Sequence, residues 1–171
     1  MARPVLVALL LAVLAACSAG PTPHWVKGGS TGGNTGPTWS KTSSTRAGRQ
    51  ILARAQAMVN GGIIIRGGCW DYINAVYNRA GYPEAKRREV FRTRKSGPYA
   101  DPKLIQPGDW LYFVNHSYGG IEHSGIFVEW INIRTRQARM LSYAGEKRRE
   151  PARYSPYDIS DTYAIIRPKP D

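Results

Sequence analysis

The stretch Gly67-Gly68-Cys69-Trp70-Asp71-Tyr72-Ile73-Asn74-Ala75-Val76-Tyr77 places a cysteine at the point where a glycine turn becomes a helix. Two adjacent glycines allow the backbone to turn sharply. After Cys69 the apolar residues recur at helical spacing, at Ile73, Val76, Tyr77 and Ala80. The pattern predicts a helix that begins at Cys69 and stops at Gly81. Cys69 therefore lies in the first turn of the predicted helix.

A thiol in the first turn of a helix is a candidate nucleophile. Unpaired backbone N–H groups and the positive end of the helix dipole favour its thiolate form. Such a thiol needs a base, and the best candidate is His123, which begins a mostly apolar run to Trp130 that is typical of a strand. The alternative is that Cys69 is a small core residue and His123 an ordinary strand histidine.

The N-terminal residues 1–17 predict a signal for export. A short positive start is followed by an apolar run, Val5 to Ala16, which is too short to span a bilayer as a permanent helix. The apolar run ends in the sequence Leu14-Ala15-Ala16-Cys17. This sequence resembles the lipobox of bacterial lipoproteins, in which cleavage leaves the cysteine as a lipid-modified first residue.

We therefore expect a protein of the bacterial cell envelope, anchored to the membrane through lipid at Cys17. Ser18 follows the lipid cysteine where an inner-membrane lipoprotein often has aspartate, which favours the outer membrane if two membranes are present. The alternatives are an ordinary signal peptide with a chance cysteine, or a disulfide between Cys17 and Cys69.

Composition separates the rest of the chain into a tether and one domain. Residues 18–45 are mostly Gly, Ser, Thr and Pro, and predict a flexible tether because they cannot bury enough apolar surface to offset their ordering. Residues 46–171 suffice for one small domain with a core, but not for two.

The charge is strongly basic, with 24 Lys and Arg against 12 Asp and Glu, a net charge of +12. The basic residues form several short clusters, and no single stripe stands out. Export argues against a nucleic-acid partner, so the charge favours anionic components of the envelope, either acidic wall polymers and peptide carboxylates or lipid head groups. The alternative is a solvated basic surface without a specific partner.

The order of the predicted elements indicates an α+β domain, with helices first and antiparallel strands afterwards. Ser44 or Thr45 can cap a first helix, and a third, very basic helix is expected after Pro83. The expected helices are 45–59, 69–80 and 84–94, and the expected strands are 110–114, 123–130, 137–143 and 163–167.

Three features in this order resemble the NlpC/P60 and CHAP group of papain-like cysteine peptidases and amidases. They are the cysteine at a helix start, Pro107-Gly108-Asp109 before a strand, and His123-Ser124-Gly125-Ile126 on the next strand. The match covers roughly residues 49–168. It implies a papain-like fold with N-terminal helices on a small antiparallel sheet, and an enzyme that cleaves peptide or amide bonds, here in peptidoglycan stem peptides.

The resemblance also implies residue roles. Cys69 would be the nucleophile that forms a thioester, with its own backbone N–H as an oxyanion donor, and His123 the general base. A third polar residue on the following strand orients the histidine in that family. It falls at Ser142, in Met140-Leu141-Ser142-Tyr143, where the family usually has His, Asn, Gln or an acid.

Two other classes of function stay open. Ser142 would suit a catalytically degenerate domain that binds wall peptide or a partner protein, and the same thioester would serve an acyl or amide transferase. The family's common Asp-Cys-Ser-Gly is Gly68-Cys69-Trp70-Asp71 here, closer to the CHAP pattern, so the subfamily is also open.

Two further residues are candidates for the substrate groove. Trp70 follows the nucleophile, and His116 lies in the loop before the next strand, although a core tryptophan and a solvated histidine are the ordinary interpretations. The three histidines and the one available cysteine are not spaced in the sequence as the ligands of a zinc site are, so we expect no metal and no cofactor.

Overall fold

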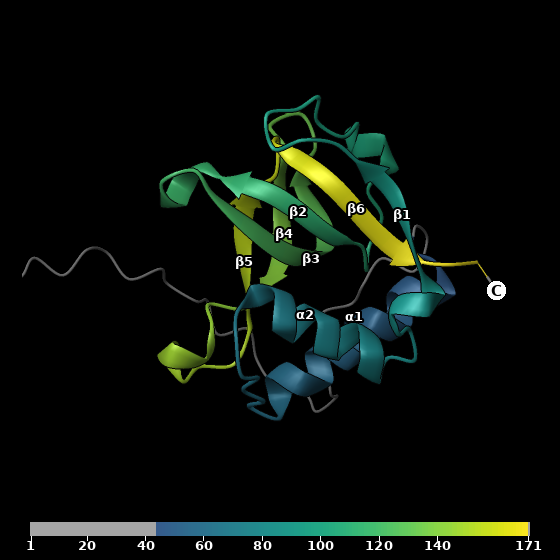
Figure 1. Ribbon diagram of the computed structural model, residues 1–171, viewed down its shortest axis with the longest axis vertical. Helices are drawn as coiled ribbons and strands as arrows, with labels where there is room; N and C mark the ends of the chain where they lie inside the picture. Colours follow the sequence, from purple (N-terminus) through teal and green to yellow (C-terminus); the bar gives the residue numbers. More distant parts are fainter. Residues whose placement is uncertain (1–43, 171) are drawn as a thin grey trace, which may run out of the picture. The chain divides into compact units, whose positions relative to one another are not determined.

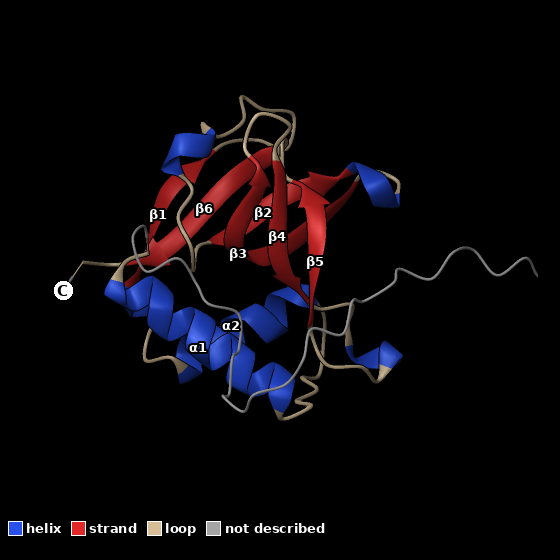
Figure 2. Cartoon of the chain, turned by 180° about the vertical axis from the view of Figure 1, so that it is seen from behind, coloured by secondary structure: helices blue, strands red, loops and turns tan. Residues whose placement is uncertain are grey.

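The computed structural model describes residues 44–170. The predicted export signal with Cys17, and the predicted tether up to residue 43, lie outside the described residues. The described part forms two α-helices and a six-stranded sheet in which all neighbouring strands are antiparallel. Both helices lie together on one side of the sheet (Figures 1 and 2). The α+β class expected from the sequence is confirmed.

The sheet order is β1-β6-β2-β3-β4-β5, so the β2–β3 hairpin lies at its centre. No helix within residues 44–170 is both long and apolar enough to cross a membrane. The helices are α1 (Arg46–Asn60) and α2 (Cys69–Arg79), with short 3-10 turns η1 (Glu84–Lys86), η2 (Pro102–Leu104), η3 (His116–Tyr118) and η4 (Glu146–Arg148). The strands are β1 (Arg87–Arg92), β2 (Trp110–Asn115), β3 (Ile121–Asn132), β4 (Gln137–Ser142), β5 (Arg153–Asp158) and β6 (Thr162–Pro168).

Two of the three predicted helices begin where the sequence indicates. The Thr45 hydroxyl caps α1 by accepting a hydrogen bond of 3.0 Å from the Gly48 amide. Before α2, Gly67 has φ +110°, and a Cβ at this position would lie 2.1 Å from the Asp71 carboxylate. That carboxylate accepts a hydrogen bond of 2.8 Å from the Gly68 amide. Glycine at position 67 is therefore needed for the turn that starts α2 at Cys69.

The core has two parts, one on each side of the sheet, because successive strand residues point to opposite faces. The part beneath the helices includes Tyr72, Ile73, Val76 and Tyr77 of α2 with Trp110, Ile126 and Leu141 of the sheet. The part on the other face includes Leu111, Phe113, Phe127, Met140 and Ile165. Strand β3 therefore has side chains in both parts of the core.

The expected third helix over residues 84–94 is wrong. Only a 3-10 turn forms at Glu84–Lys86, and residues 87–92 form β1, an edge strand paired with β6. Its Val90 and Phe91 pack against the second part of the core. Hydrogen bonding to β6 and this burial outweigh the local helical pattern of a charged segment.

A buried ion pair fixes the position of the Pro-Gly-Asp turn before β2. Asp109 is 1% exposed and receives two hydrogen bonds of 2.7 Å from Arg167 of β6, one to each carboxylate oxygen. The Gln106 amide also donates to it at 2.7 Å. The ion pair thus links the start of β2 to the end of the neighbouring strand.

The same turn also contacts both helices. Gly108 has φ +93°, and a Cβ there would lie 2.5 Å from the Cα of Gly48 in α1. The Tyr77 hydroxyl of α2 donates a hydrogen bond of 2.6 Å to the Gly108 carbonyl. Two glycines in contact therefore set how closely α1 approaches the sheet.

We expect Asp109→Asn to lower the free energy of unfolding by about 3–5 kcal/mol, because it leaves the Arg167 guanidinium, itself mostly buried, without its counter-charge. Urea denaturation measures the loss. Glu129→Gln is the matched control, since it breaks the exposed pair with Arg139 and should cost less than about 1 kcal/mol. Equal losses in the two variants would show that the buried pair has no special role.

Candidate active site

A cleft of about 290 Å³ lies at the N-terminus of α2. Its wall includes Cys69 from α2, His123 from β3, Ser142 from β4 and Tyr157 from β5. Figure 1 shows the start of α2 close to the end of β4 and the beginning of β5. The structure thus brings together the three residues that the sequence predicts as nucleophile, base and orienting residue.

A short hydrogen-bond chain holds the histidine. His123 Nε2 lies 2.7 Å from Ser142 Oγ, and the Tyr157 hydroxyl donates to the same oxygen at 2.9 Å. Ser142 is only 5% exposed. Because Nε2 is engaged by the serine, Nδ1 is the ring nitrogen that remains for the cysteine.

Aromatic contacts further restrict the imidazole. The Phe113 ring meets the His123 ring nearly at right angles, with centroids 5.6 Å apart, and the Tyr157 ring lies 5.6 Å away at 32°. The two aromatic rings also contact each other, at 5.7 Å. The serine and the rings together favour a single orientation of His123.

The environment of Cys69 favours its thiolate. Burial raises the pKa of the thiol, but hydrogen bonds with His123 and Ser124 and the charge of His123 lower it, so that the pKa falls from 9.0 to about 7. First-turn amides without intrahelical partners add positive potential at the same place. With this pKa about half of the thiol is ionised at neutral pH.

Two residues of the site were not found from the sequence. Ser124 is 2% exposed, and it is one of the residues that lower the pKa of the Cys69 thiol. Tyr157 lies on β5, a strand that we did not predict and that contains a proline, Pro156. In the pairing of β5 with β4, Tyr157 lies opposite Ala138, and its hydroxyl reaches Ser142 of the same strand β4.

The two candidate groove residues lie outside the wall of the cleft. Trp70 is 49% exposed, packs on Trp110 with ring centroids 5.8 Å apart, and lines a neighbouring pocket. His116 lies in η3, where Nε2 is 2.5 Å from Asp161 Oδ2. Its neighbours Asn115 and Tyr118 line the cleft instead.

Within residues 44–170, no three His, Cys, Asp or Glu side chains come together as they would at a metal site. Cys69 carries a free thiol, and Cys17 lies outside the described residues, so a disulfide between the two stays untested. Comparison of the chain with protein-family models, curated proteins and solved structures gave no match.

We expect the rate of alkylation of Cys69 by iodoacetamide to rise with pH through a midpoint of about 7. His123→Ala should move the midpoint upward, because it removes the hydrogen bond and positive charge that oppose burial. The measurement uses the full-length chain in a Cys17→Ala background, so that Cys69 is its only cysteine. An unchanged midpoint in the His123 variant would contradict the Cys–His pairing.

Ser142→Ala and Tyr157→Phe should each slow alkylation of Cys69 at pH 7, because each removes a hydroxyl of the chain that holds His123. In the double variant the alkylation rate should fall by a smaller factor than the two single factors multiplied together. The expected coupling energy is about 0.5–3 kcal/mol, since the two hydroxyls act through one hydrogen bond. Tyr157→Phe keeps the ring contacts and so controls for packing. Strictly multiplicative losses would mean that the tyrosine does not act through the serine.

Proposed function

We propose that the protein is an exported papain-like cysteine hydrolase of the NlpC/P60 type, which cleaves amide or peptide bonds in peptidoglycan stem peptides. The observation that carries the proposal is the Cys69 thiol, with a pKa of about 7, in one cleft with His123, whose other ring nitrogen is held by Ser142. A merely structural cysteine needs neither the lowered pKa nor a fixed histidine.

In the acylation step the Cys69 thiolate attacks the carbonyl carbon of the scissile amide. The negative charge that develops on the carbonyl oxygen is stabilised by amides of the first turn of α2, including that of Cys69 itself. His123, protonated in the ion pair, gives its proton to the amide nitrogen. The C–N bond breaks, the amine leaves, and the acyl group remains on sulfur as a thioester.

In the deacylation step water attacks the thioester carbon while neutral His123 takes a proton from it. The C–S bond breaks, the carboxylic acid leaves, and the thiolate and the imidazolium are restored. Ser142 and Tyr157 keep the imidazole in one orientation through both steps.

The charge of the cleft supports a substrate that carries a carboxylate. Arg148 and Arg153 line the same cleft as Cys69, and both side chains are exposed. The acidic wall residue Glu122 is already engaged by Lys95 and Tyr163. Neither arginine is in an ion pair within residues 44–170. Their guanidinium groups suit the carboxylates of wall stem peptides, and the proposed lipid anchor at Cys17 would hold the enzyme near them.

The test is the release of new amino groups and peptide fragments from purified peptidoglycan, followed by amine labelling and mass spectrometry. The wild-type chain should release them. His123→Ala should lower the rate by about 100- to 10,000-fold, and Cys69→Ser should do so at least as strongly. Glu129→Gln, which changes only an exposed charge outside the cleft wall, should leave the rate unchanged.

Each rival function has its own outcome in this experiment. Binding of peptidoglycan without release, and without any effect of Cys69→Ser, would indicate a degenerate binding domain. A product that forms only with an added amine or alcohol acceptor would indicate a transferase.

A further inference from the structure

A basic groove lies between α1 and α2, away from the Cys69 cleft. Two neighbouring cavities of about 620 and 430 Å³ share Gln50 and Ala80 and so form one continuous depression. Neither cavity has a lining residue in common with the cleft. We call this depression the helix groove.

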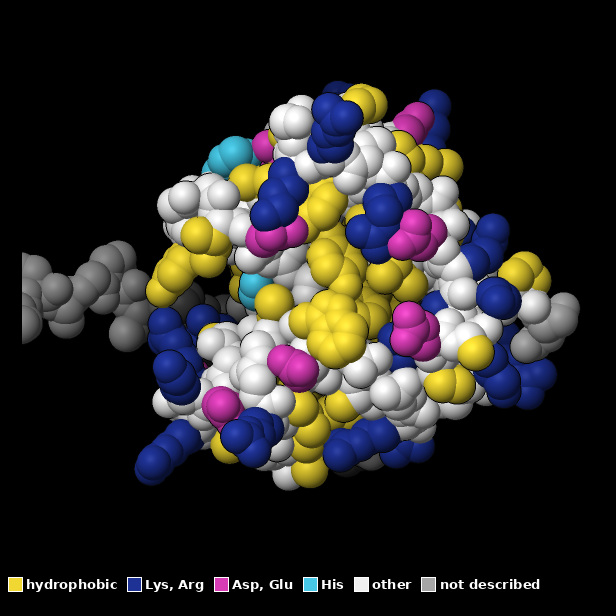
Figure 3. All heavy atoms as spheres, in the orientation of Figure 1, with side chains coloured by type: hydrophobic (Ala, Val, Ile, Leu, Met, Phe, Trp, Pro, Cys, Tyr) yellow, Lys and Arg dark blue, Asp and Glu magenta, His cyan; other side chains and the backbone are white. Residues whose placement is uncertain are grey.

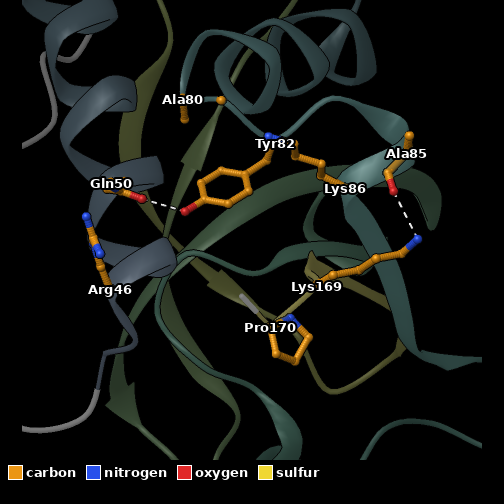
Figure 4. Close-up of a pocket in the computed structure, with 9 residues that line it drawn as sticks. Arg46, Gln50, Ala80, Tyr82, Ala85, Lys86, Lys169 and Pro170 are labelled. Atoms are coloured by element: carbon orange, nitrogen blue, oxygen red, sulfur yellow. Dashed lines mark hydrogen bonds between the residues drawn. The ribbon is translucent and has the colours of Figure 1, made fainter.

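The helix groove collects positive charge from separate parts of the chain. Its lining includes no Asp or Glu, and its five cationic residues come from α1, α2, η1 and the segment after β6: Arg46, Arg54, Arg79, Lys86 and Lys169. Figure 4 shows its larger cavity, with Arg46 and Lys169 on opposite sides of Tyr82. In Figure 3, Lys and Arg gather at the edge where α1 begins in Figure 1. Five cationic residues that lie far apart in the sequence thus line one groove.

These charges are not neutralised within the described part of the chain. All five side chains belong to exposed residues, and none is in an ion pair within residues 44–170. The Lys169 ammonium donates to the Ala85 carbonyl at 2.9 Å, which leaves its charge in place. Uncompensated like charges in one groove repel each other and attract an anion.

The shape of the helix groove suits a chain lying along it. Arg46, Gln50 and Arg54 recur every four residues and so follow one face of α1. The small side chains of Ala53 and Ala57 lie on the same face, and Arg79 lines the groove from α2. Cations on both walls with small side chains between them form a site that a narrow polymer can enter.

We propose that the helix groove binds a linear polyanion built from phosphate groups. A phosphate has oxygens that project in several directions, so one group can contact cations on both walls at once. A carboxylate presents its two oxygens in a single plane and fits one wall better. The partner is therefore a phosphate-rich chain of the environment into which the protein is exported.

Two other anionic partners fit the helix groove less well. A bilayer surface is flat, and the exposed large hydrophobic residues of the described part, which would enter it, all lie outside the groove lining. Single-stranded nucleic acid is bound by stacking on several aromatic rings, whereas the groove offers only Tyr82, whose hydroxyl is engaged by Gln50.

The helix groove and the cleft lie near opposite ends of α2. Arg79 ends the helix and Cys69 begins it, and eleven residues span about 15 Å. Binding in the groove therefore leaves the cleft open. The proposal for the groove stands whether or not Cys69 is a catalytic nucleophile.

The test measures the Kd of the full-length protein, kept in non-ionic detergent, for fluorescent long-chain inorganic polyphosphate at several NaCl concentrations. The groove variant combines Arg54→Gln, Arg79→Gln and Lys86→Gln. It should bind at least about tenfold more weakly, and the slope of log Kd against log salt should fall by about two to three. The matched control removes three exposed charges elsewhere, with Arg94→Gln, Arg134→Gln and Lys147→Gln, and should change Kd by less than about twofold.

Four results would overturn the proposal. Equal losses in the two triple variants would mean that diffuse charge, rather than the groove, binds polyphosphate. Tighter binding of polyglutamate of equal charge would assign the groove to carboxylates. Preference for vesicles of anionic phospholipid, or for oligo-dT of equal charge, would assign it to a bilayer or a nucleic acid. No binding to any of these probes would leave the groove as a solvated basic surface.

Discussion

The buried ion pair between Asp109 and Arg167 is the interaction on which the arrangement of the described domain depends. It joins the turn before β2 to the end of β6, next to the point where Gly108 touches Gly48 of α1 and accepts a hydrogen bond from Tyr77 of α2. One turn therefore positions both helices and the neighbouring strands β2 and β6. A buried carboxylate in this place must have its guanidinium partner, because an unpaired buried charge costs several kcal/mol.

The candidate site follows from this arrangement. Packing of α2 over β3 brings the first turn of the helix to the strand that carries His123, and β4 and β5 add Ser142 and Tyr157 from the same edge. A serine is a short partner for an imidazole, yet here it lies 2.7 Å from Nε2 and is itself held by the tyrosine hydroxyl. The hydrogen-bond chain compensates for the short serine side chain. Two consecutive hydrogen bonds restrict rotation of the serine hydroxyl and of the imidazole more than a single hydrogen bond would.

Helix α2 also relates the two proposed sites. Its N-terminus carries the thiol, where the helix dipole and free amides favour a negative charge, and its C-terminal end carries Arg79 beside the helix groove. An enzyme held on a polyanion through the groove would keep its cleft open toward neighbouring peptides. Five of the 24 Lys and Arg residues of the chain then have a definite place in the fold.

The sequence by itself determined the local features. The glycine turn and the apolar spacing located the start of α2 at Cys69, and Ser44 or Thr45 marked the start of α1. Runs of apolar and bulky residues located the central strands, including the one with His123, because these features depend on neighbours in the chain. Only the tertiary structure decided that residues 87–92 form an edge strand, that Tyr157 reaches Ser142, and that five cations from four segments line one groove. These depend on pairing between distant segments, and no local pattern encodes which strand or helix a segment will meet.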